Sequence, residues 1–258
     1  MEQEQKLREM AVFFERSAAE LRTHLSTAMA AADQLGDGGE LLGSLRLSLH
    51  RMLRLAWNLN DFSLAAAEAP LHLVNTGAAE LVQSVYDESA VLLADIGRTL
   101  RLETGENLSG VAMHPYAARR ILYQLLSNAA AVTPQGGTIR LACRRTAAQV
   151  LFSVSDEGGG IDPNTLDGIF TAPFAAEDDF SPHGLRIGLP LAKLLAEKQG
   201  GRLLAESSEK GCCFTLALPT GQKADSLRDM KADYSGGVCR PLVELSPVLT
   251  RKTFSDGE

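Results

Sequence analysis

The sequence lacks long hydrophobic runs, cysteine motifs and a surplus of basic residues, and each absence excludes a class of protein. No stretch of about 18 apolar residues occurs, so a membrane-spanning helix is not expected. The four cysteines contain no CxxC pair, which argues against a disulfide framework and a zinc site. The net charge of -7 disfavours a general nucleic-acid binder. The charged N-terminus does not resemble a signal peptide, and a reduced, cytoplasmic protein is expected.

Two heptad series indicate a helical hairpin over residues 1–69. They are separated by a glycine-rich break at 36–39, and two helices joined in this way pack antiparallel. Each apolar stripe is too wide for one partner helix, so we expect a homodimeric four-helix bundle; packing on the second domain is the alternative. The series are Ala11, Phe14, Ala18, Leu21, Leu25, Ala28, Ala32 and Leu35, then Leu42, Leu45, Leu49, Met52, Ala56 and Leu59.

Helix and strand patterns alternate over residues 70–219, which predicts a two-layer α/β sandwich. Helices are expected at 78–94, 115–132 and 189–198, and strands at 98–103, 138–144, 149–155, 202–206 and 212–218. Residues 220–258 form a C-terminal extension. It begins as a polar linker and then has the character of a short strand over 238–249, interrupted by Pro241 and Pro247.

Two segments of the second domain carry polar residues suited to a ligand. Gln124 and Asn128 lie four residues apart on an otherwise apolar helix, so both amides are on one face. Asp156 directly follows a strand, and Gly158 and Gly160 allow the backbone to approach a ligand closely. A carboxylate at a strand end can accept a hydrogen bond from an exocyclic amine such as that of adenine.

Two further segments could close a pocket. Phe170 and Phe174 anchor a long loop that could act as a lid. Gly184 and Gly188 flank the start of a helix, where free N–H groups and the helix dipole favour phosphate. Each of the four segments taken singly also fits an ordinary cap, turn or surface loop.

Taken together and in this order, the four segments resemble the ATP-binding domain of sensor histidine kinases, whose fold gyrase-, Hsp90- and MutL-type ATPases share. The resemblance covers residues 70–219 and implies an α+β protein, a helical hairpin followed by a histidine-kinase-type sandwich. It implies ATP and Mg²⁺ as cofactors, with Asp156 at adenine N6 and Asn128 at Mg²⁺ and the phosphates. The implied ATP-binding residues are Gln124, Asn128, Asp156, Gly158, Gly160, Ile161, Phe170, Gly184, Arg186, Gly188 and Leu189.

Three residues depart from the family pattern at the phosphate end. Gln124 stands where the family usually has a metal-assisting Asn, Asp, Glu or His, and it offers Mg²⁺ a neutral oxygen. Ala131 stands where many members have a basic residue. Arg186 replaces a glycine, so its side chain either crowds the phosphate path or supplies the cation missing at position 131.

Residues 19–25 resemble the family's phosphoacceptor segment, a His followed by Glu-Leu-Arg-Thr-Pro-Leu. Ala19 occupies the His position, and since alanine has no nucleophile, phosphorylation there is excluded. The resemblance gives Glu20 an acid/base role and Thr23 a role in orienting water during dephosphorylation of a response regulator. His24 and His50 are interpreted as exposed surface histidines.

Two functions are consistent with these residues. The first is a two-component, histidine-kinase-like protein that binds ATP and lacks the usual acceptor His. The second is a non-catalytic docking or phosphatase-type regulator. In both cases a response regulator or a partner kinase is the expected partner. A third hypothesis is a stand-alone ATPase of the gyrase or Hsp90 type, and the lack of a second ATPase domain in the sequence counts against it.

Overall fold

Two units make up the chain: Pro70–Asp233, and a helical unit formed by Met1–Ala69 together with Tyr234–Glu258. The computed structural model describes residues 21–32, 39–66, 71–166, 168–170, 187–224 and 238–255. Among these residues, no helix is both long and apolar enough to cross a membrane.

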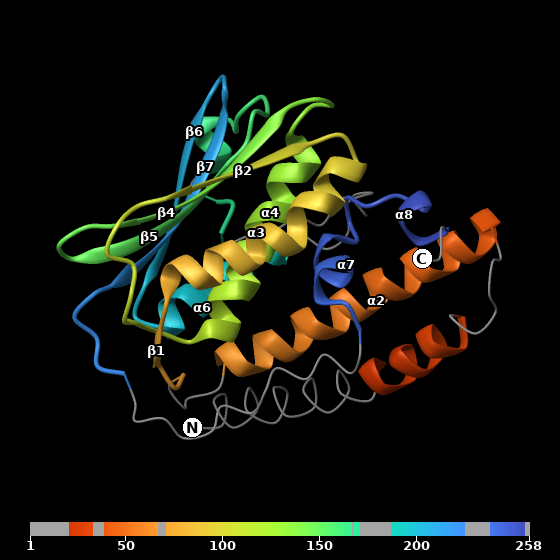
Figure 1. The fold of residues 1–258 in the computed structure, drawn as a ribbon, viewed down its shortest axis with the longest axis horizontal. Helices are drawn as coiled ribbons and strands as arrows, with labels where there is room; N and C mark the ends of the chain where they lie inside the picture. The colour runs from red at the N-terminus through yellow and green to blue at the C-terminus, as the bar shows by residue number, and fades with distance from the viewer. Residues whose placement is uncertain are drawn as a thin grey trace. The chain divides into compact units, whose positions relative to one another are not determined.

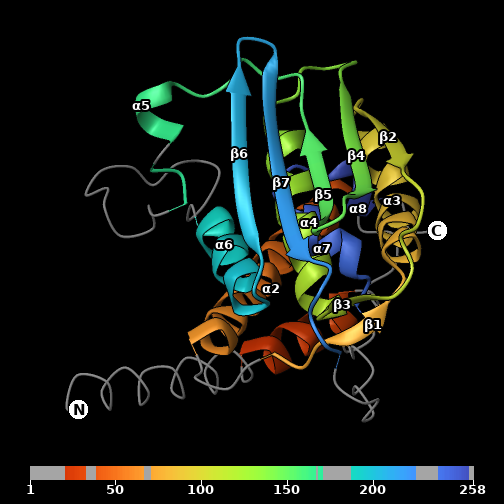
Figure 2. The same ribbon diagram turned by 90° about the vertical axis from the view of Figure 1, so that its left-hand side faces the viewer.

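A five-stranded sheet forms one layer of the unit Pro70–Asp233. Its order is β2 (Thr99–Thr104), β4 (Thr138–Arg145), β5 (Gln149–Ser155), β7 (Gly211–Pro219) and β6 (Arg202–Ser208), seen side by side in Figure 2. The β2–β4 pair is parallel, and the other neighbours are antiparallel. Along β4, Ile139 and Leu141 are buried while Arg140 is exposed, so the strand has one core face and one open face.

Three helices cover one face of this sheet and complete the predicted two-layer sandwich (Figure 1). They are α3 (Ala78–Asp95), α4 (Pro115–Val132) and α6 (Gly188–Lys198). Pro115 suits the first turn of α4, because a backbone N–H at this position would have no acceptor within the helix. The His114 side chain accepts a hydrogen bond from the Ala117 N–H at 3.2 Å. Two thirds of the residues of α4 are buried, which makes it the central helix of the unit.

Three short elements complete this unit; a short strand is expected from the sequence over residues 71–74, whereas the other two elements were not predicted. β1 (Val74–Thr76) pairs antiparallel with β3 (Val111–Met113). α5 (Pro163–Leu166) is a single turn after the glycine-rich segment, where a loop was expected. Elements this short leave too few residues for a periodic pattern to be recognised.

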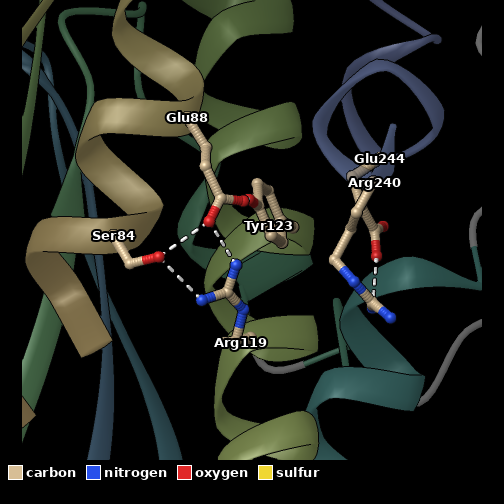
Figure 3. Close-up of polar contacts among 6 residues, drawn as sticks. All are labelled: Ser84, Glu88, Arg119, Tyr123, Arg240 and Glu244. Carbon is tan, nitrogen blue, oxygen red and sulfur yellow. Dashed lines mark hydrogen bonds and ion pairs between the residues drawn. The ribbon is translucent and has the colours of Figure 1, made fainter. Parts of the chain in front are cut away.

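A polar cluster joins α3 to α4 (Figure 3). Glu88 accepts hydrogen bonds from Ser84 Oγ at 2.7 Å, from Arg119 Nη2 at 2.5 Å and from the Tyr123 hydroxyl. Burial by itself raises the pKa of Glu88, but these three hydrogen bonds and the Arg119 charge outweigh it and hold the pKa below its usual value. The carboxylate therefore stays charged and ties the two helices together.

In the helical unit, the helix over residues 21–32 packs beside α2 (Gly39–Ala66) (Figure 1). One apolar cluster joins them, made of Leu25, Met29, Ala32, Leu42, Leu49, Leu53, Ala56, Trp57 and Val243. Val243 belongs to the C-terminal segment 238–255, which forms α7 (Arg240–Leu245) and α8 (Lys252–Ser255). Both short helices contact α2.

The C-terminal segment is fastened to α2 by hydrogen bonds and by close packing. Arg46 Nη1 donates to the Phe254 carbonyl oxygen at 3.1 Å, and Arg51 Nε donates to the Ser246 carbonyl oxygen at 3.1 Å. A Cβ on Gly43 would lie only 2.6 Å from the Arg251 carbonyl oxygen, so the backbones approach closely there. Residues far apart in the sequence therefore build one unit.

The expected strand character of residues 238–249 is wrong, because this segment forms α7 and a following turn. Pro241 lies in the first helical turn, where proline is favoured rather than disruptive. Arg240 and Glu244, one turn apart, form an ion pair at 3.8 Å (Figure 3). The Arg240 guanidinium also lies 5.1 Å from the centroid of the Trp57 ring, so a cation–π contact adds to the packing on α2.

The interpretation of His50 as a surface residue is also wrong. Its exposed fraction is 6%, its Nδ1 lies 2.8 Å from the Arg46 carbonyl oxygen, and its ring lies 4.6 Å from that of Phe254. A heptad pattern describes only the face toward the partner helix of a hairpin. It cannot indicate that a segment 208 residues later in the sequence packs against another face of the helix.

A second apolar face of α2 remains exposed. Leu41, Leu45, Met52 and Leu55 have exposed fractions between 39% and 85%. At about 100° per residue they form one continuous stripe, whose centre lies roughly 90° from the buried face of the same helix.

Candidate functional site

One face of α4 runs between two of the predicted pocket segments. Gln124, Asn128 and Val132 follow one another at intervals of four residues and therefore share this face. A Cβ added to Gly188, the first residue of α6, would lie 2.7 Å from Gln124 Oε1. At the other end, a Cβ added to Gly158 would lie 3.0 Å from Val132 Cγ2. Asn128, which is half-buried, lies between these two contacts.

The side chain of Asp156 is buried and held by two backbone donors. Its Oδ1 accepts hydrogen bonds from Gly158 N at 2.9 Å and from Cys212 N at 3.2 Å. The other carboxylate oxygen, Oδ2, accepts none from the described residues. The carboxylate therefore has a fixed orientation and one oxygen left for a ligand.

The hairpin of β6 and β7 forms the back of the glycine-rich turn. A Cβ on Gly211 would overlap the Asp156 carbonyl oxygen, and a Cβ on Gly160 would overlap the Ser208 carbonyl oxygen. Gly160 also has a φ of +75°, a conformation that glycine adopts without strain. Two glycines, one on each side, thus permit direct contact between the turn and the hairpin.

The end of the turn is bonded to the same hairpin. Ser207 Oγ accepts a hydrogen bond from Ile161 N at 2.7 Å and donates one to the Ile161 carbonyl oxygen at 3.2 Å. On the opposite side, Glu157 Oε2 accepts from Thr138 N, at the start of β4, at 2.9 Å. Two neighbouring elements therefore hold the turn.

Phe170 contributes the third predicted segment. Its ring lies edge-on to that of Phe214 on β7, with centroids 6.3 Å apart, and Lys193 Nζ on α6 lies 6.0 Å from its centroid. These contacts connect the segment to the sheet and to α6.

Some of the predicted site residues lie outside the described part of the chain, namely Ala19, Glu20, Phe174, Gly184 and Arg186. Thr23 is exposed on the helix 21–32 of the helical unit. Gly188 and Leu189 are half-buried at the start of α6. Sequence reasoning missed Val132, Ser207 and Cys212; Ser207 pairs with Cys212 because the hairpin turns at residues 209–210.

Comparison with known proteins agrees with this geometry. Residues 113–222 match the family of histidine kinase-, DNA gyrase B-, and HSP90-like ATPases. The adaptive-response sensory kinase SasA of Synechococcus sp. (strain JA-2-3B'a(2-13)) is 30% identical over 233 residues, 83% of this chain and 61% of that protein. The sensor histidine kinase ZraS of Salmonella typhimurium is 32% identical over 122 residues, 46% of this chain and 25% of that protein. The chain thus spans less than two-thirds of these relatives.

Solved structures show the same fold. Full-length ShkA, crystallised in complex with AMPPNP, has a TM-score of 0.66 at 23% identity, covering 83% of this chain and 47% of that chain. The histidine kinase AdeS of Acinetobacter baumannii has a TM-score of 0.58 at 17% identity, covering 79% and 98%. The unit Pro70–Asp233 is therefore an ATPase domain of the histidine kinase, gyrase and HSP90 type. Over 83% of its length the chain is similar to a sensory kinase, SasA.

The adjacent residues Gly159 and Gly160 allow a matched test of the turn. In Gly160→Ala the new methyl group overlaps the Ser208 carbonyl oxygen at a φ that L residues disfavour, so we expect unfolding free energy to fall by about 2 kcal/mol or more. In Gly159→Ala no atom lies within 4 Å of the new methyl group, and we expect a change below about 1 kcal/mol. Urea unfolding measures both, and equal stabilities would contradict this description of the turn.

Proposed function

We propose that the chain is a two-component signalling protein of the histidine-kinase type that binds ATP in the unit Pro70–Asp233 and cannot be phosphorylated at position 19. The observation that carries the proposal is the fixed carboxylate of Asp156 at one end of the α4 face that also bears Asn128. The AMPPNP named for the ShkA structure supports an adenine nucleotide as the ligand.

Asp156 suits the recognition of adenine. Its Oδ1 is occupied by two backbone donors, so Oδ2 is the oxygen that can accept the exocyclic amine. The orientation is set before the ligand arrives, which reduces the ordering cost of binding. The exposed Glu157 beside it is bonded to Thr138 N and belongs to the support of the turn.

The phosphate end fits Mg²⁺ through Asn128. Mg²⁺ keeps several waters and needs only one or two protein oxygens beside the phosphates, so a single amide oxygen suffices. Gln124 stays a predicted second ligand, but it is 1% exposed and its oxygen faces Gly188. The close approach of Gln124 to Gly188 suits a role in fixing the start of α6. The bound ion would neutralise charge on the phosphates.

The first test is nucleotide affinity. Asp156→Asn keeps an oxygen for the two backbone donors but turns the ligand-facing acceptor into a donor, so we expect binding of a fluorescent ATP analogue with Mg²⁺ to weaken at least about tenfold. Glu157→Gln is the matched control, because its amide oxygen can still accept from Thr138 N. The control should bind like the wild type. Absence of wild-type binding at millimolar nucleotide would overturn the proposal.

A second test concerns the destination of the phosphate. With γ-labelled ATP, we expect no phosphohistidine in the wild type, because Ala19 has no nucleophile. Ala19→His restores an imidazole nitrogen that can take the γ-phosphoryl group while ADP leaves. Label in this variant alone would support an intact transfer apparatus.

If the Ala19→His variant takes up no label from ATP, the result would instead favour the second function, a docking or phosphatase-type regulator of a response regulator. The exposure of Thr23 on the helix 21–32 is compatible with that role. Phosphohistidine in the wild type would contradict the proposed loss of the acceptor.

We propose also that the helical unit forms a homodimer. The exposed stripe of Leu41, Leu45, Met52 and Leu55 lies roughly 90° around α2 from the face that packs against the first helix. A helix in a four-helix bundle has two neighbours at about that angle. The α2 residues that contact the C-terminal segment are centred roughly 150° from the stripe, so this segment leaves the stripe open.

Glutamate substitutions in the stripe test the dimer. The double variant Leu45→Glu with Met52→Glu buries two charges in the proposed interface, and we expect light scattering to give a monomer where the wild type is a dimer. Val91→Glu on α3 is the control, because this residue is a comparably exposed hydrophobic outside the stripe. A double variant with the mass of the wild-type dimer would exclude this interface.

A further inference from the structure

The hydroxyl of Ser207 uses its complete hydrogen-bonding capacity at the end of the glycine-rich turn. A serine hydroxyl has one proton to donate and two lone pairs. Here the proton goes to the Ile161 carbonyl oxygen, while Ile161 N and Cys212 Sγ are the donors. The Ser207 Oγ–Cys212 Sγ distance is 3.5 Å. One side chain thus holds both backbone groups of Ile161.

The thiol of Cys212 is suited to act as a donor in this arrangement. Burial, with smaller contributions from the Asp156 and Cys213 charges, raises the pKa of Cys212 despite the opposing hydrogen bond with Ser207. The thiol therefore keeps its proton at neutral pH. The neighbouring backbone group, Cys212 N, is the donor to Asp156 Oδ1. Ser207 and Cys212 face each other in the β6–β7 register.

The hairpin consequently holds the turn at both ends. Cys212 N binds the carboxylate of Asp156 where the turn begins, and Ser207 Oγ binds the peptide groups of Ile161 five residues later. Between these points, Gly160 adopts a positive φ against the Ser208 carbonyl oxygen. The residues from 157 to 160 contribute three glycines, which have the largest conformational freedom to lose on ordering.

We propose that Ser207 is a positioning residue for adenine-nucleotide binding, which fixes the Ile161 end of the glycine-rich turn without touching the ligand. The proposal rests on the proposed nucleotide site at Asp156. Without the Ser207 hydroxyl, the hydrogen bonds that hold the turn to other described elements are at its start, on Asp156 and Glu157. Binding must then order the rest of the turn, and that cost lowers the affinity.

The experiment compares three variants by nucleotide affinity. We expect Ser207→Ala to weaken binding of the fluorescent ATP analogue by about tenfold, and Ser207→Thr, which keeps the hydroxyl, to restore affinity to within about threefold. Ser208→Ala is the control, because among the described residues Ser208 Oγ bonds Lys210 N and the Gly211 carbonyl oxygen, both within the hairpin turn. It should bind like the wild type. Wild-type affinity in Ser207→Ala, or no rescue by Ser207→Thr, would overturn the proposal.

Hydrogen exchange separates this proposal from the nucleotide site itself. The Ile161 amide, whose hydrogen-bond acceptor is Ser207 Oγ, should exchange at least about tenfold faster in Ser207→Ala without nucleotide, while amides of β4 are unchanged. If the wild type binds no nucleotide, the nucleotide site and the positioning role both fail, even if exchange at Ile161 accelerates. If the wild type binds and the Ile161 amide exchanges at the wild-type rate in Ser207→Ala, only the role of Ser207 fails.

Discussion

The pair of hydrogen bonds to Asp156 Oδ1 is the interaction on which the geometry of the site depends. One donor, Gly158 N, comes from the same turn, and the other, Cys212 N, comes from β7. The second bond requires the backbone of the hairpin to touch that of the turn. Gly211 makes this possible, because a side chain at that position would overlap the Asp156 carbonyl oxygen. The orientation of one carboxylate is thus determined by a glycine on a neighbouring strand.

Sheet topology and helix periodicity then bring the remaining groups to this carboxylate. Pairing of Ser155 with Cys213 places the end of β5 beside the start of β7, so Asp156 and Cys212 are neighbours. On α4, a spacing of four residues puts Asn128 between the residues that contact the glycine-rich turn and α6. The site therefore combines a sheet register with a helical period, and a shift of one residue in either would separate its parts.

Much of the fold of the second unit could be predicted from the sequence because its signals are local. Alternation gave the five strands of the sheet, and Pro115 marked the start of α4. The grouping of Asn128 with Asp156 came from resemblance to a family, since no local pattern relates residues on a helix and a turn. The burial of His50 and the path of the C-terminal segment could not be predicted from the sequence. They depend on contacts such as Arg46 with Phe254, which no periodicity encodes.

The C-terminal segment packs on α2 but does not cover the exposed stripe of this helix. An apolar face that a helical hairpin leaves exposed can be covered by another segment of the same chain. Here residues 238–255 return to α2, yet they pack around Gly43, His50 and Trp57, away from the stripe. The described residues of the chain therefore leave Leu41, Leu45, Met52 and Leu55 exposed even after this cover is added. A contiguous apolar surface of this kind favours association with another molecule, and a second copy presents a matching stripe.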